Sequence, residues 1–244
     1  MSSLTSAASR RVRHNRLAQE RIDDGRESLT AYDLRLHGAR YRLAARVEQR
    51  GVALDLGCGS GYGGEILSRS DVRLVGLDRN ASTPRGSRSS PYVGIIRGEG
   101  LHLPFQNGAF TTVVMLEVIE HLDSPSRLLS EVYRVLSPDG VLILSTPNRN
   151  GLTKLLLKTI GWRNPFHLHE YNWEEMLRLL DAGFEVLDCR GLDFFKFGIE
   201  SSLSRSEFLS RVFVDDLARI APRVSSTMFF VCRKQRPGWV KNRR

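Results

Sequence analysis

Short apolar runs alternate with amphipathic stretches along most of this chain of 244 residues. A short apolar run bounded by turn residues predicts a buried strand, whereas apolar residues spaced three or four apart predict a helix. On these grounds the pattern predicts strands at residues 51–56, 72–78, 93–98, 110–118, 140–148, 184–191 and 226–234.

Helical patterns separate several of these runs. Ser124 and Pro125 suit the start of one helix, because serine caps helix N-termini and proline is tolerated in the first turn. Residues 79–92 predict a loop, since proline, glycine and serine crowd this segment. The helices are expected at residues 34–49, 61–70, 124–136, 151–161, 172–182 and about 200–220.

The alternation of strands and helices indicates an α/β fold with a doubly wound sheet, because the predicted strands are apolar on both faces. In such sheets, ligands bind beyond the carboxyl ends of the strands, where the strand order reverses. The first strand and the turn after it are therefore the expected ligand site. The sequence shows no internal repeat, and no apolar run is long enough to span a bilayer.

Charge is spread unevenly along the chain, whose net value is +9. Residues 1–26 carry +3 and residues 233–244 carry +6, so the stretch between them is neutral. We expect basic, partly disordered extensions at 1–33 and 235–244 around one domain at 34–234. Basic tails can bind nucleic acid or an anionic membrane, but solvated chain ends are the simpler interpretation. The three cysteines have no metal-binding spacing, which predicts reduced thiols in a cytoplasmic protein.

The stretch "VALDLGCGSGYGGEIL" joins a predicted strand to a predicted helix through a group of glycines. Gly59, Gly61 and Gly64 fit a dinucleotide-binding pattern, with Asp78 about 20 residues later. Asp55 argues against that interpretation, because a carboxylate before the turn disfavours a pyrophosphate and favours an ammonium group. The turn therefore suits a small ligand that approaches bare backbone and has no phosphate.

Further blocks follow in order: "GEGLHLPFQNGAF", "EVIEHL", "EVYRVLSPDGVLILSTPN" and "HEYNWEEMLRLLDAGFEV". Together with the glycine stretch, they resemble the class I S-adenosylmethionine (SAM) dependent methyltransferases of the type 11 group, over residues 34–191. The resemblance implies a Rossmann-like sheet of seven strands whose last strand is antiparallel. It also implies SAM as the cofactor.

The resemblance gives each residue of the cofactor site a role. The glycine turn would lie under the methionine part of SAM, and Gly61 would let the next helix start close to the strand. Asp78 would accept hydrogen bonds from both ribose hydroxyls, Glu99 would accept one from the adenine amino group, and Leu101 or its neighbours would pack on the adenine ring. The implied cofactor-binding set is Asp55, Gly57, Cys58, Gly59, Gly61, Asp78, Glu99, Gly100, Leu101 and Glu117.

Two segments depart from the family pattern. A helix with an adenine-packing residue usually follows the position of Asp78, whereas this chain has the predicted loop at 79–92. The family often has "FD" at the start of the fourth strand, where this chain has Phe110 and Thr111. The adenine side of the pocket is therefore the part that the resemblance defines least.

Glu117, Glu120 and His121 follow the fourth predicted strand, near the expected position of the sulfonium. On a helical turn their spacing would place all three on one face. Transfer to a hydroxyl requires alignment of the acceptor and removal of its proton, so His121 and Glu117 are the candidate catalytic residues. Carboxylates with one or two imidazoles also suit Mg²⁺ or Mn²⁺ better than structural zinc, which gives the candidate metal set Glu117, Glu120, His121 and His167.

The E-x-x-E-H pattern with a later histidine resembles two metal-dependent branches of the superfamily. These are the O-methyltransferases of ubiquinone synthesis and the 2′-O-methyltransferases that act on the 3′ ends of small RNAs. Two simpler interpretations stay open beside metal binding: His121 acts as a base, or it hydrogen-bonds a backbone carbonyl.

The acceptor is the least defined part of the prediction. Residues 149–170 interrupt the core pattern, and in this family such inserts shape the acceptor pocket. Apolar residues there and phenylalanines within 192–208 suit a lipid-like, aromatic or polyketide acceptor, although ordinary packing explains them equally well. The predicted function is methyl transfer from SAM to a hydroxyl of a small molecule, lipid or glycan. The alternatives are a metal-assisted RNA 2′-O-methyltransferase and a SAM-binding regulator without turnover.

Overall fold

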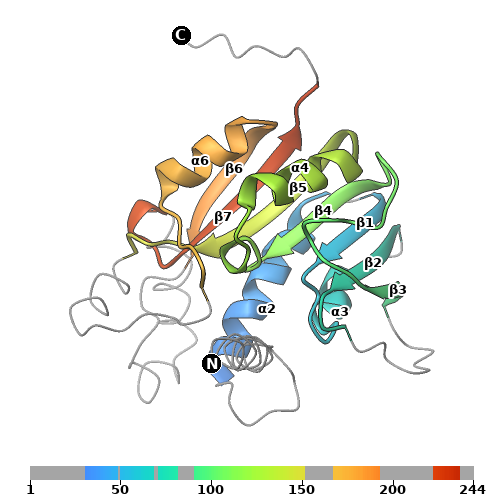
Figure 1. The fold of residues 1–244 in the computed structure, drawn as a ribbon. Coiled ribbons are helices and arrows are strands. Elements are labelled where there is room, and N and C mark those ends of the chain that lie inside the picture. The colour runs from blue at the N-terminus through green and yellow to red at the C-terminus, as the bar shows by residue number, and fades with distance from the viewer. Residues whose placement is uncertain are drawn as a thin grey trace, which may run out of the picture.

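A seven-stranded sheet with helices on both faces forms the body of the protein (Figure 1). The predicted helices at 151–161 and about 200–220 lie outside the described residues, as do most of the two basic extensions. The computed structural model describes residues 31–48, 50–68, 71–81, 91–151, 167–192 and 222–236, without the side chains of 31–36.

The strands lie in the order β3-β2-β1-β4-β5-β7-β6. The first five strands in the chain run parallel, whereas β7 is antiparallel to both β5 and β6. This topology confirms the doubly wound α/β sheet with an antiparallel last strand. The strands are β1 (Gly51–Leu56), β2 (Val72–Asp78), β3 (Tyr92–Arg97), β4 (Phe110–Leu116), β5 (Leu136–Pro147), β6 (Phe184–Leu192) and β7 (Thr227–Lys234).

The helices agree with the sequence pattern except at some ends. Ser124 precedes α4 as predicted, but its side chain makes no capping hydrogen bond. At the start of α6, by contrast, Asn172 forms a full capping box with Glu175, because the side chain of each residue accepts a hydrogen bond from the backbone N–H of the other. The helices are α2 (Ala31–Arg46), α3 (Gly63–Leu67), α4 (Pro125–Val135) and α6 (Trp173–Asp181), with 3₁₀ turns η1 (Ile119–His121) and η3 (Pro222–Val224).

Two hydrophobic clusters cover the two faces of the sheet. Successive strand residues point to opposite faces, so Leu54 and Met115 join the cluster on the side of α4 and α6, while Ala53 and Val114 join the cluster on the side of α2 and α3. This arrangement explains why the strand segments are almost continuously apolar. None of the described helices has the length and apolar character needed to cross a membrane.

The carboxyl ends of the parallel strands meet at one edge of the sheet, because all five run in the same direction. The glycine loop follows β1, and Asp78 is the last residue of β2. Glu117 follows β4, and Thr146 lies close to the end of β5. The fold therefore brings most of the predicted site residues to a single edge.

Candidate active site

The glycine loop, which follows β1, has a restricted backbone conformation and is closely packed. Gly57, Gly59 and Gly61 have φ angles of 83°, 57° and 88°, in the left-handed region that other residues rarely adopt. The Gly57 N–H donates to the Leu77 carbonyl on β2 at 2.7 Å. A Cβ on Gly57 would lie only 2.4 Å from Cγ2 of Val118. The loop thus requires glycine at this position, and it lies directly against the turn that follows β4.

Asp78 connects the end of β2 to the glycine loop. Its half-buried carboxylate accepts hydrogen bonds from the Gly59 N–H at 3.0 Å and from the Asn80 N–H at 2.7 Å. An ionised carboxylate offers about four acceptor positions, so both oxygens can accept further hydrogen bonds. Asp78 can therefore fix the loop and still accept hydrogen bonds from a pair of ligand hydroxyls.

Asp55 lies on β1 and is only 1% exposed. The Tyr92 hydroxyl donates to its Oδ2 at 2.5 Å, and the Tyr41 hydroxyl donates to its Oδ1 at 3.3 Å. Burial raises the pKa of Asp55 to about 7, although both hydrogen bonds act to lower it. A Cβ on Gly63 would clash with the Tyr41 ring, and one on Gly64 with the Tyr92 ring, each at 2.2 Å. The structure thus favours a supporting role for Asp55 beneath the loop over the direct contact with a ligand ammonium group that the sequence suggested.

The segment after β3 contributes the residues expected around adenine. Glu99 is exposed at the edge of the sheet, and Leu101 packs against the α4-side cluster. A Cβ on Gly100 would crowd a leucine of α4 at 3.0 Å. Cys58 lies buried in the glycine loop and contributes to the α2-side cluster. Residues 82–90, which belong to the predicted loop on the adenine side, lie outside the described part of the chain.

Glu117 adopts an unusual backbone conformation directly after β4. Its φ of 57° lies in the left-handed region, and its N–H donates to the Ser145 carbonyl at 3.0 Å. The Ser145 hydroxyl donates to Oε1 of Glu117 at 2.8 Å, and Nε of Arg40 lies 3.4 Å from the same oxygen. The prediction that Glu117, Glu120 and His121 lie on one face of a helical turn is therefore wrong. The helical turn η1 begins two residues later, and the Glu117 carboxylate contacts β5 and α2 instead.

Glu120, His121 and His167 form a cluster in the described part of the chain. One ligand atom from each residue lies within 4.8 Å of the other two. Glu120 is fully buried, and the Thr146 hydroxyl donates to its Oε2 at 3.0 Å. The two imidazole rings meet edge to face with their centroids 5.3 Å apart. The structure thus brings together these three residues of the expected metal set, whereas Glu117 lies outside the cluster.

The position of His167 is fixed from two sides. Its Nδ1 lies 2.7 Å from Oε1 of Glu170, an arrangement that favours the tautomer with the lone pair on Nε2. The backbone N–H groups of Leu168 and His169 donate to the Glu120 carbonyl at 2.9 and 3.2 Å. A segment distant in sequence is therefore held against η1 with a defined imidazole orientation.

Sequence reasoning missed Arg40 of α2 and five further residues that shape this edge. Glu170 had a local signal, because it lies only three residues after the candidate ligand His167. The other four lacked a local signal, since their carboxylate partners lie 14 to 37 positions away in the sequence. They are Tyr41, Tyr92, Ser145 and Thr146.

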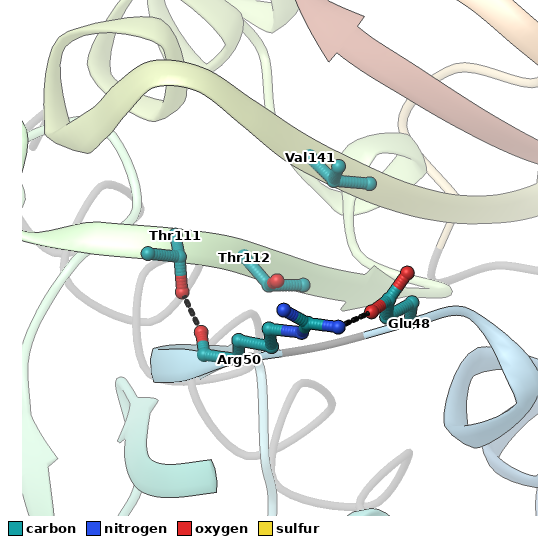
Figure 2. Close-up of a pocket in the computed structure, with 5 residues that line it drawn as sticks. All are labelled: Glu48, Arg50, Thr111, Thr112 and Val141. Carbon is teal, nitrogen blue, oxygen red and sulfur yellow. Dashed lines mark hydrogen bonds and ion pairs between the residues drawn. The ribbon is translucent and has the colours of Figure 1, made fainter. Parts of the chain in front are cut away.

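An open hollow of about 410 Å³ lies at the opposite, amino-terminal edge of the strands (Figure 2). An ion pair between Arg50 and Glu48 lines it, and the Thr111 hydroxyl donates to the Arg50 carbonyl. Thr112 and Val141 complete the lining. None of the predicted site residues lines this hollow, so it is separate from the candidate active site.

The chain is similar to known methyltransferases. Residues 30–188 match a family model described as "Methyltransferase domain". A Mycolicibacterium smegmatis protein named "Probable S-adenosylmethionine-dependent methyltransferase" is 40% identical over 164 residues, which are 66% of this chain and 62% of that protein. A "Ubiquinone biosynthesis O-methyltransferase" of Psychrobacter arcticus is 29% identical over 140 residues, which are 53% of this chain and 49% of that protein. The chain thus spans about three fifths of the length of the first relative and about half of the second.

A solved structure shares the fold. The N-methyltransferase NodS of Bradyrhizobium japonicum, in complex with S-adenosyl-L-homocysteine (SAH), superposes with a TM-score of 0.58 at 15% identity, covering 92% of this chain and 99% of that one. At this identity the likeness concerns the fold alone. The family model, however, covers well over half of the chain, and the sequence relatives agree with it. The chain therefore belongs to the class I SAM-dependent methyltransferases of the type 11 group.

Proposed function

We propose that this protein binds SAM at the carboxyl edge of the sheet and transfers the methyl group to a hydroxyl of a small molecule, lipid or glycan. The observation that carries the proposal is the contact between the glycine loop and Asp78, with the Gly59 N–H 3.0 Å from the carboxylate. This contact joins two adjacent strand ends in a chain that belongs to a SAM-dependent family.

The residues at this edge fit a cationic nucleoside better than a dinucleotide. The glycines of the loop after β1 adopt left-handed φ angles and carry no Cβ, so a ligand can approach the loop backbone closely. Asp78 and Glu99 offer carboxylates to hydroxyl and amino groups, which both donate hydrogen bonds. A pyrophosphate would instead face negative charge on neighbouring strand ends. We assign Asp78 to the ribose and Glu99 to adenine.

The histidine cluster supplies the proton chemistry in this proposal. Bound SAM provides a methyl group that its positive sulfur already activates. A bond forms between the acceptor oxygen and the methyl carbon while the sulfur–carbon bond breaks, and the hydroxyl proton must leave. We assign that proton to the imidazoles of His121 and His167, because the Glu170 carboxylate 2.7 Å from His167 would stabilise an imidazolium.

A divalent metal at the same cluster is a second proposal. One carboxylate and two imidazoles within 4.8 Å of one another fit Mn²⁺ better than Mg²⁺, which prefers oxygen ligands, and the Glu170 carboxylate would orient the imidazole of His167. A metal there would lower the pKa of an acceptor hydroxyl. Calorimetric titration with MnCl₂ alone tests this proposal, since binding that is lost in Glu120→Gln supports it and no uptake of Mn²⁺ contradicts it.

The decisive experiment uses methyl-labelled SAM and a cell extract, with and without a chelator. A labelled small molecule, lipid or glycan supports the proposed function, and sensitivity to the chelator supports the metal. Label in RNA would favour the RNA alternative, and truncating residues 1–26 and 233–244 would then reveal whether the basic tails recognise it. SAM binding without any labelled product would favour a regulator.

A further inference from the structure

Arg40 of α2 is a buried charge without a role in the proposed chemistry. Its side chain is 2% exposed, and its Nε lies 3.4 Å from Oε1 of Glu117. Its Nη2 donates to the Thr227 hydroxyl at the start of β7, at 3.0 Å. Burying a guanidinium is unfavourable unless an anion and hydrogen-bond acceptors compensate for the lost water. Arg40 therefore connects α2 to the turn after β4 and to the beginning of β7.

The turn at Glu117 depends on these contacts. A left-handed conformation is unfavourable for a residue with a Cβ, so surrounding interactions must hold it in place. Oε1 of Glu117 forms an ion pair with Arg40 and accepts a hydrogen bond from the Ser145 hydroxyl. The next residue, Val118, already fills the space that a Cβ on Gly57 would need. A small shift of this turn would therefore change the space beside the glycine loop.

The neighbouring residue of α2 reaches the other side of the same loop. Tyr41 donates to the buried carboxylate of Asp55 at 3.3 Å, and its ring lies where a Cβ on Gly63 would fall. The helix α2 packs beside α3 and β4 on one face of the sheet (Figure 1). Two consecutive residues of one helix thus hold the loop after β1 and the turn after β4.

We propose that Arg40 is a positioning residue of the cofactor site that acts through Glu117, and that α2 is consequently part of this site. The inference rests on the proposed binding of SAM. It assigns Arg40 no contact with the reacting atoms. Its effect on the cofactor passes through the carboxylate that it holds.

A double-mutant cycle tests this inference by calorimetric titration with SAH. We expect Arg40→Gln and Glu117→Gln each to weaken SAH binding about tenfold. The combined variant should bind SAH within about threefold of Glu117→Gln alone, because coupled residues give non-additive effects. Arg42→Gln changes an exposed arginine on the same helix and should leave SAH affinity unchanged.

The outcomes separate the two proposals. If the effects of Arg40→Gln and Glu117→Gln multiply in the combined variant, Arg40 does not act through Glu117, and only the inference falls. If the wild-type protein takes up no SAH, the proposed function falls together with the inference. If circular dichroism shows that Arg40→Gln does not fold, the variant Arg40→Lys, which keeps the positive charge, takes the place of Arg40→Gln in the double-mutant cycle.

Discussion

Two buried carboxylates at the same edge of the sheet have very different surroundings. Asp55 is 1% exposed and accepts hydrogen bonds from two tyrosine hydroxyls, which lie beneath the glycine loop. Glu120 is 0% exposed and accepts one from Thr146, but it also lies within 4.8 Å of ligand atoms of two histidines. We call the surroundings of Asp55 the glycine end and those of Glu120 the histidine end.

The difference teaches that burial alone does not mark a catalytic carboxylate. At the glycine end, two tyrosine hydroxyls donate to Asp55, and their rings pack closely against Gly63 and Gly64, so we infer that this carboxyl group supports the packing beneath the loop. At the histidine end, groups that can carry a proton or bind a cation converge on Glu120. We therefore expect changes at the glycine end to act on cofactor affinity and stability, and changes at the histidine end to act on turnover.

His167→Ala should give the largest effect. We expect the methyl-transfer rate to fall about 10²- to 10³-fold, because the variant removes a group that takes up the hydroxyl proton. SAH affinity should stay within about threefold of the wild type, since the glycine end is untouched. Initial rates with labelled SAM measure the methyl transfer, and calorimetry measures the affinity for SAH. His169→Ala removes an exposed neighbouring histidine as a matched control, and an equal loss of rate in that control would remove the special role of His167.

Gly57→Ala should weaken the glycine end. The left-handed φ of 83° and the approach to Val118 at 2.4 Å should together lower the free energy of unfolding by about 3 kcal/mol. SAH affinity should fall as well, because the loop must shift. Gly94→Ala is the matched control, since a Cβ there meets no atom within 4 Å. Urea unfolding of both variants measures the contrast, and equal stability losses would contradict the account of the loop.

Asp55→Asn should change how stability depends on pH. Because burial raises the pKa of Asp55 to about 7 in the folded protein, the folded state keeps a proton that the unfolded state releases near pH 4. Wild-type stability relative to Asp55→Asn should therefore fall by about 1.4 kcal/mol per pH unit between pH 4 and 7, and level off above pH 7. Urea unfolding across this range measures the slope. A difference that stays constant with pH would mean that Asp55 is already ionised in the fold.

Glu170→Gln should have the smallest effect of the four. The change removes the charge next to His167 while keeping a hydrogen-bonding group of similar shape, so the rate should fall about tenfold. Initial rates with labelled SAM measure the change, and SAH affinity should stay within about threefold of the wild type, because the glycine end is untouched. A rate equal to that of the wild type would show that Glu170 only anchors the segment.

The sheet and the glycine loop could be predicted from the sequence, because apolar runs and glycines are local signals. The long β5 was predicted to start at 140 but starts at Leu136, where it pairs with Phe110 before a shift in register. Such pairing depends on the neighbouring strand and leaves no mark in the local pattern. The number of strands and the antiparallel last strand followed from the family resemblance, and the structure confirms them.

Most of the predicted site residues lie at one edge of the sheet, but the geometry of that edge was predicted only in part. The helical reading of EVIEHL failed at its first residue, because contacts from α2 and β5 hold Glu117 in a left-handed conformation. The role of Asp55 depended on Tyr41 and Tyr92, which the fold brings together from α2 and β3. Both differences arise from contacts between residues far apart in sequence, which a periodic pattern does not reveal.

Calorimetric titration of the full chain with SAM, SAH and NADH tests the central claim most directly. The acidic edge around the glycine loop predicts saturable binding of SAM and SAH, with one molecule per chain, and no uptake of NADH. The variant Asp78→Asn should weaken the binding of both SAM and SAH, because it replaces the carboxylate to which the ribose hydroxyls are assigned. Tight binding of NADH with no affinity for SAM or SAH would contradict the account.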